Sequence, residues 1–181
     1  MRNRLVGLLF VFVSAAALAE VPWQTFACPE GQFSVAGFGA PNVTVTHEST
    51  PLGTIDEHTY RWVRGPFECD VEYSDVPSLS TMGGGKLLFN QVSRGFKHDT
   101  GEPVKNERPW TCQGYTGRAF EFHRPKKPGQ IAQSGMGRVL LVGSRLYVLV
   151  VTWDRDKPPA SSADGDRFLD SFAPDTTTPT P

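Results

Sequence analysis

The residues best suited to chemistry in this chain are a cysteine and a histidine, Cys112 and His123. They lie on two segments that alternate like neighbouring strands, so a thiolate and a base would meet if those strands ran side by side. A cysteine activated by a histidine is the nucleophile of thiol-dependent enzymes. The sequence names no third residue to orient the histidine, and a disulfide at Cys112 would remove the nucleophile. A thiol-dependent hydrolase is therefore the alternative interpretation.

A second polar group, Asp56 and Glu57 beside His58, has the residue types of a metal site. Zinc ligands usually come in pairs at helical or knuckle spacing, and the other histidines add no such pair. Polar surface residues between strands explain the group adequately. We expect no metal and no cofactor, with Asp56 and His58 as the candidates for a metal-assisted hydrolase.

Two sets of side chains could bind a partner. A basic patch would receive an acidic protein or polyanion, and an aromatic cleft would receive an apolar ligand. Acidic residues elsewhere balance the basic ones, which favours a solvated rim, and aromatic residues on strands are more often core. The basic candidates are Arg118, Arg124, Lys126, Lys127 and Arg138, and the aromatic candidates are Tyr115, Trp110, Trp62 and Trp153.

Two motifs fail on inspection. The run Gly83–Lys86 is not a phosphate loop, because Ser80 stands where its first glycine should be and Leu87 where a hydroxyl must meet Mg²⁺. Neither Ser134 nor Ser144 has the flanking glycines of a nucleophile elbow.

The first 19 residues have the three regions of a secretory signal peptide: basic Arg2 and Arg4, an apolar run from Leu5 to Val13, and small residues ending at Ala19. We therefore expect a secreted or periplasmic protein. In an oxidising compartment, one disulfide would form among Cys28, Cys69 and Cys112, and the sequence does not choose the pair.

The rest of the chain predicts one domain over residues 20–173, followed by a disordered tail rich in Thr and Pro over residues 174–181. The net charge of −1 offers no field that would draw the protein to nucleic acid or an anionic membrane. No later segment is apolar for long enough to span a bilayer.

Alternation with a period of two predicts a series of antiparallel strands. In one of these strands, Phe67–Tyr73, the apolar residues share one face and Glu68, Asp70 and Glu72 share the other, which we interpret as a solvent-facing row. The other segments are 32–36, 42–46, 59–63, 110–113, 118–122, 139–142 and 145–153.

A hairpin and two helices complete the prediction. Gly143–Ser144 is typical of a type II′ turn, which places Leu141 opposite Leu146 and Leu140 opposite Tyr147. Its second strand is apolar on both faces from Leu146 to Val151, which indicates a central, covered strand. Helical spacing predicts helices over 85–96 and about 163–172, with a polar loop over 97–108 and a basic surface loop over 125–129. Together these predict an α+β fold, a central antiparallel sheet flanked by helices on both faces.

Seven segments, in order along the chain, resemble secreted or periplasmic bacterial domains of unknown function in the PsbP-like superfamily. This resemblance implies an α/β/α sandwich, and accessory or assembly roles rather than catalysis. The segments are Glu30–Val35 with Pro41, Thr50–Gly53, Val71–Pro77, Gly84–Leu88, Gly114–Phe122, Leu141–Tyr147 and Asp166–Phe172.

The sequence therefore favours an exported, non-catalytic accessory domain that binds a protein partner or a small apolar ligand. It identifies neither one.

Overall fold

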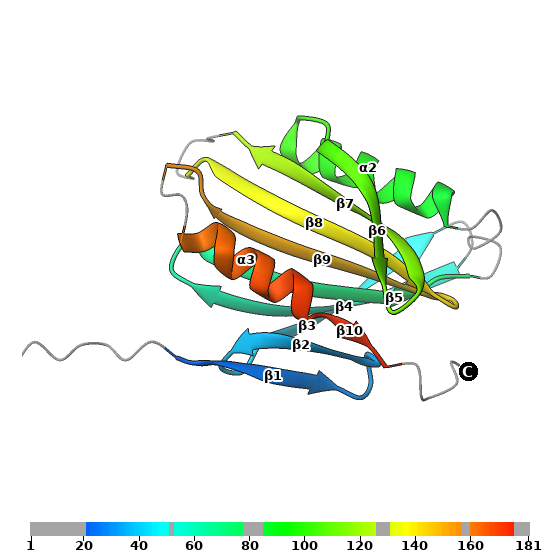
Figure 1. Ribbon diagram of the computed structural model, residues 1–181. Coiled ribbons are helices and arrows are strands. Elements are labelled where there is room, and N and C mark those ends of the chain that lie inside the picture. The colour runs from blue at the N-terminus through cyan, green and yellow to red at the C-terminus, as the bar shows by residue number, and fades with distance from the viewer. Residues whose placement is uncertain (1–20, 51–52, 78–84, 126–130, 157–159, 176–181) are drawn as a thin grey trace, which may run out of the picture.

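The computed structural model describes residues 21–50, 53–77, 85–125, 131–156 and 160–175 (Figure 1). These residues form two antiparallel sheets and two helices. A seven-stranded sheet has the order β3-β4-β5-β9-β8-β7-β6, and a three-stranded sheet has the order β1-β2-β10. The elements are β1 (Trp23–Cys28), β2 (Phe33–Phe38), β3 (Asn42–Thr50), β4 (Gly53–Arg64), β5 (Phe67–Asp75), α2 (Lys86–Thr100), β6 (Lys105–Cys112), β7 (Tyr115–Arg124), β8 (Gln133–Val142), β9 (Arg145–Asp154), α3 (Ala160–Ser171) and β10 (Ala173–Pro174).

Strand β9 is the central strand of the larger sheet, as its apolar composition predicts. Leu141 lies opposite Leu146 and Leu140 opposite Tyr147, so the predicted hairpin register is confirmed. Gly143 has a φ of 61°, and Ser144 is not among the residues with positive φ, which is the pattern of a type II′ turn.

The predicted architecture, a single central sheet flanked by helices on both faces, is wrong, because a second sheet covers part of one face. The face of β9 that carries Leu149 is covered by the small sheet together with α3, whose Phe168 and Leu169 join the same core. Helix α2 packs over β7 on the opposite face. A strand that is apolar on both sides needs two covering layers, and a second sheet buries apolar surface as well as a helix does. The described residues thus form a mostly β fold, with two packed sheets and two short helices, arranged as in Figure 1.

Several boundaries also differ from the prediction. Helix α2 continues to Thr100 and ends where Gly101, at a φ of 78°, donates its N–H to the Lys97 carbonyl at 2.9 Å. Strand β6 begins at Lys105, so the predicted polar loop over 97–108 is reduced to residues 101–104. Pro174 belongs to β10, opposite Phe33 of β2, and not to the predicted disordered tail. The predicted signal peptide, residues 126–129 of the predicted basic loop, and residues 176–181 lie outside the described residues.

The two sheets meet in an aromatic core. The ring of Phe33 on β2 packs against those of Tyr147 at 6.3 Å and Phe172 at 5.9 Å, and Trp62 meets Phe168 edge to face at 5.7 Å. Such pairs add to the free energy gained by burying the rings. Across the described part of the chain, neither helix has the length and apolar character needed to cross a membrane.

Candidate functional site

The structure does not bring Cys112 and His123 together. Strands β6 and β7 do pair, but Cys112 lies opposite Tyr115, and His123 is eight residues further along β7, a separation of about 26 Å. The Cys112 thiol donates to the Phe172 carbonyl at 3.4 Å, and burial raises its pKa, which disfavours the thiolate. His123 Nδ1 lies 3.2 Å from the Ser134 hydroxyl instead.

Asp56 and His58 share one face of β4 but have separate partners. Asp56 lies 2.6 Å from Nδ1 of His47 on β3, and the His58 ring stacks on Tyr73 at 4.5 Å. Among the described residues, no group of three or more His, Cys, Asp or Glu side chains is placed to hold a metal ion.

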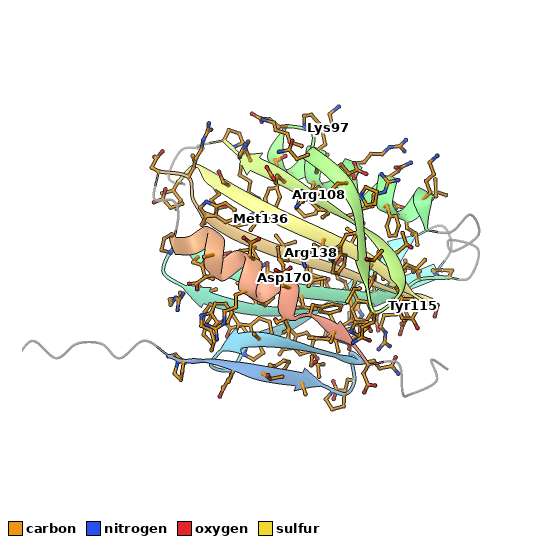
Figure 2. The ribbon with its side chains drawn as sticks, viewed as in Figure 1. Lys97, Arg108, Tyr115, Met136, Arg138 and Asp170 are labelled. Carbon is orange, nitrogen blue, oxygen red and sulfur yellow. The ribbon has the colours of Figure 1, made fainter. Side chains whose placement is uncertain are left out.

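The three candidate arginines do not form one patch. Pairing across β7, β8 and β9 places Arg118 and Arg124 on the side of the sheet that faces α2, and Arg138 on the other side. Arg118 forms an ion pair with Glu107. Arg138 pairs with Asp170 of α3 (Figure 2).

The aromatic candidates are also dispersed. Trp62 is 1% exposed and belongs to the core. Trp110 is paired with Gly117, close to Tyr115 at the tip of the β6–β7 hairpin. The Arg138 guanidinium lies over the Trp110 ring, 5.0 Å from its centre. Trp153 is at the other end of the sheet, opposite Ser134. Lys126 and Lys127 lie outside the described residues.

The predicted disulfide is not formed: Cys28, Cys69 and Cys112 are all free, and each lies on a different element. Cys28 at the end of β1 accepts a hydrogen bond from the Gly31 N–H at 3.2 Å. Cys69 is fully buried on β5, and burial raises the pKa of its thiol. Cys112 is on β6.

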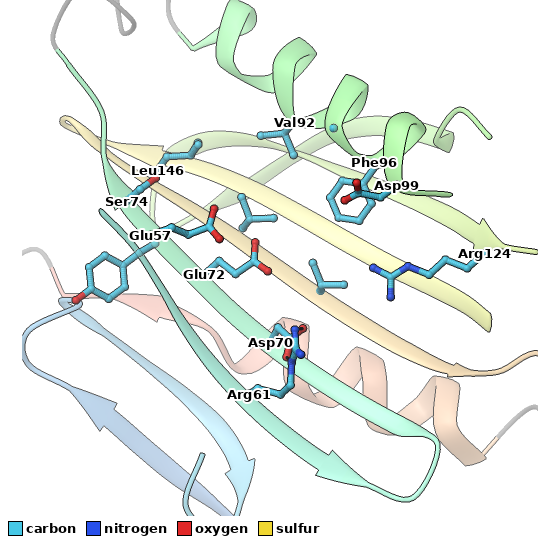
Figure 3. Close-up of a pocket in the computed structure, with 14 residues that line it drawn as sticks. Glu57, Arg61, Asp70, Glu72, Ser74, Val92, Phe96, Asp99, Arg124 and Leu146 are labelled. Carbon is cyan, nitrogen blue, oxygen red and sulfur yellow. Dashed lines mark hydrogen bonds and ion pairs between the residues drawn. The ribbon is translucent and has the colours of Figure 1, made fainter. Parts of the chain in front are cut away.

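The acidic face of β5 is where the sequence interpretation missed a site. Asp70 is 7% exposed and Glu72 is half-buried, so the row that we interpreted as solvent-facing is largely covered. Both carboxyls line a cavity of about 460 Å³ between α2 and strands β4, β5 and β9 (Figure 3). Ligand sites are typically concave, with apolar walls and a few placed polar groups.

Strand register explains how the cavity acquires two chemically different walls. Three rows run across β4, β5 and β9: Arg61–Asp70–Val150, Thr59–Glu72–Val148 and Glu57–Ser74–Leu146. Each row therefore changes from polar to apolar as it crosses from β4 to β9. Helix α2 closes the space with Val92, Gly95, Phe96 and Asp99, and Arg124 reaches in from β7.

The carboxyls of the polar wall are not equally neutralised. Arg61 donates to both oxygens of Asp70, at 2.8 and 3.0 Å, and this offsets part of the increase in pKa that burial causes at Asp70. Burial raises the pKa of Glu72 to about 8, and the nearby carboxylates Glu57 and Asp70 add to the effect. Such a carboxyl changes charge near neutral pH, which is a common property of functional sites.

One sequence signal points to this cavity. An acidic row on a strand is solvent-facing only if nothing covers its face, and the neighbour of that strand, β9, is apolar on both faces. A layer that covers the Val148 and Val150 face of β9 also covers Glu72 of the adjacent strand. The sequence does not state that β5 and β9 are neighbours.

The chain thus has two packed β-sheets with a partly acidic cavity under a helix. No protein-family model and no curated protein sequence matches it. The solution structure of cyanobacterial PsbP (CyanoP) from Synechocystis sp. PCC 6803 is similar, with a TM-score of 0.59 and 11% identity over 90% of this chain and 98% of that one. The Pseudomonas aeruginosa protein of unknown function PA94 matches with a TM-score of 0.45 and 9% identity, over 88% and 98% of the two chains. The chain has a PsbP-like fold, which confirms the resemblance seen in the sequence.

Proposed function

We propose that this protein is an exported, non-catalytic binding domain, and that the cavity under α2 holds a small ligand with an apolar body and one positively charged group. The observation that supports this is the pair of unlike walls. Leu146, Val148 and Val150 would contact the apolar body, and Glu57 and Glu72 would face the charge.

The charges around the cavity favour a cation over an anion. Four carboxyls line it and two arginines accompany them, and one arginine, Arg61, is engaged by Asp70. A cation near Glu57 and Glu72 would relieve the repulsion between these carboxylates, whereas an anion would increase it. The proposal of export rests on the signal peptide predicted for residues 1–19.

The test compares three probes that share one hydrocarbon body: cyclohexylmethylamine, cyclohexylmethanol and cyclohexanecarboxylate. Binding is measured by calorimetry and by NMR shifts of the amides of α2 and β9. We expect the amine to bind about tenfold more tightly than the alcohol, the carboxylate to bind weakest, and the affinity for the amine to rise with pH as Glu72 ionises.

A cavity-filling variant locates the site. Gly95 faces open space, so Gly95→Leu should fill the cavity without a clash and abolish binding of the amine. Gln91→Leu adds a leucine at an exposed position of the same helix and should leave binding unchanged. Equal affinities for the three probes, or binding that survives Gly95→Leu, would refute the proposal.

A further inference from the structure

The seven-stranded sheet has two edge strands, and one of them, β6, is protected against further pairing. A free edge exposes unpaired N–H and C=O groups, and proteins block such edges with lysine, proline and bulges. Strand β6 carries Lys105, Arg108 and Pro109, and its register with β7 shifts between Lys105 and Arg108. Asn106 in this irregular stretch has a φ of 51°.

The opposite edge, β3, has none of these protections. Its nine residues pair with β4 in one unbroken register and include no lysine, arginine or proline. The side chains from Val43 to His47 are exposed, with Val43 at 53% and Val45 at 45%. Exposed β-branched residues on a regular edge form a surface suited to adding a strand.

We propose that this edge pairs with the same edge of a second copy of the chain, so that two seven-stranded sheets join into one. A two-fold axis at Thr44, perpendicular to the sheet, would place Val43 opposite Val45 of the partner subunit and the two Thr44 residues opposite each other. β-branched and Thr–Thr cross-strand pairs of this kind stabilise antiparallel strands. A two-fold contact of one patch with itself is the commonest form of protein dimer.

The composition of the edge favours a second copy over an unrelated strand. The sequence of residues 43–45, Val-Thr-Val, is the same in both directions. An antiparallel copy of this segment therefore places a β-branched residue opposite each β-branched residue. From Asn42 to Thr46 there is no charged residue, and therefore nothing that selects an acidic or basic partner.

Cysteine cross-linking tests the register. In a Cys112→Ser background, which leaves Cys28 and Cys69 buried, Thr44→Cys would place two thiols within disulfide distance across the axis. Thr46→Cys is the matched control on the same strand and face, because its two thiols would lie about 14 Å apart. Under mild oxidation we expect a covalent dimer from Thr44→Cys and monomer from Thr46→Cys.

Sedimentation of the purified protein tests the dimer without cross-linking. The mass should double with rising concentration, and Val43→Lys should weaken association at least about tenfold. Val63→Lys is the control, since Val63 is 48% exposed on β4, an inner strand, and its replacement should leave association unchanged. A monomer at all concentrations up to about 1 mM, equal cross-linking at positions 44 and 46, or equal weakening by the two lysines would overturn the proposal. Circular dichroism confirms that each variant is folded.

Discussion

At the scale of single residues, the environment of Glu72 disfavours its charged form. Thr59 and Val148 lie on either side of it across the strands, and Asp70 and Ser74 precede and follow it on the same face. The nearest arginine across β4, Arg61, is engaged by Asp70. Glu72 therefore loses hydration without gaining an ion pair of its own, which is why its pKa rises to about 8.

The raised pKa predicts how stability depends on pH. The ordinary value is 4.5, so between pH 4.5 and about 8 the folded state keeps a proton that the unfolded state releases. The contribution of Glu72 to stability is thus fully favourable below pH 4.5 and is lost as the pH rises through 8. Glu72→Gln cannot ionise, so its stability relative to wild type should increase by about 2 kcal/mol from pH 5 to pH 9, a value discounted for the partial exposure of this side chain.

Chemical denaturation at several pH values measures this difference. Glu68→Gln is the control, because Glu68 is on the same face of β5 but outside the cavity. If the free energies of unfolding of Glu72→Gln and wild type differ by the same amount from pH 5 to pH 9, the pKa of Glu72 is not raised in the folded state.

At the scale of elements, two glycines of β8 set the distance between α2 and the sheet. The rings of Phe120 and Phe122 lie over Gly137 and Gly135, where a Cβ atom would come within 2.3 and 2.2 Å of ring carbons. Phe96 of α2 packs on both rings, at 4.9 Å from each. The helix rests on aromatic rings that the glycines allow to lie close to the sheet.

Replacing one of these glycines should therefore loosen the helix. Gly137→Ala should lower the free energy of unfolding by about 1–3 kcal/mol, because Phe120 must move and displace Phe96. Gly95→Ala, in the open middle of α2, should instead raise it by about 1 kcal/mol through helix propensity. Thermal denaturation of the two variants compares them, and destabilisation of equal size in both would contradict this role for Gly137.

The elements also show what the sequence could and could not predict. The β8–β9 hairpin followed from local chemistry, since Gly143 sets the turn and alternation sets the register. The covering of β9 did not, because it depends on the pairing of Ala173 with Ser34, residues far apart in the chain. The cavity was missed for the same reason: burial of Glu72 is decided by α2 and β9, and not by the alternation of β5.

At the scale of the whole molecule, side chains of β9 hold the small sheet onto the large one. The Tyr147 hydroxyl donates to the carbonyls of Gly31 at 2.8 Å and Gln32 at 3.1 Å in the β1–β2 turn. Arg145 donates to the Glu30 carbonyl at 2.8 Å while two of its nitrogens bind Asp75. These bonds are made at the point where Gln32 has a φ of 52°, a conformation that is uncommon for a residue other than glycine.

Removing the hydroxyl should separate the stabilities of the two sheets. Tyr147→Phe leaves the ring packed against Phe33 but removes the hydroxyl that donates to the carbonyls of Gly31 and Gln32, of which Gln32 keeps its bond from the Asp175 N–H. We therefore expect the free energy of unfolding to fall by about 1–2 kcal/mol. Hydrogen exchange should show this loss as faster opening of β1 and β2, with β8 and β9 affected less. Tyr115→Phe, at the tip of the β6–β7 hairpin, should change neither. Equal acceleration in both sheets would mean that they open as one unit, and that the hydroxyl contributes to general stability without fastening the small sheet to β9.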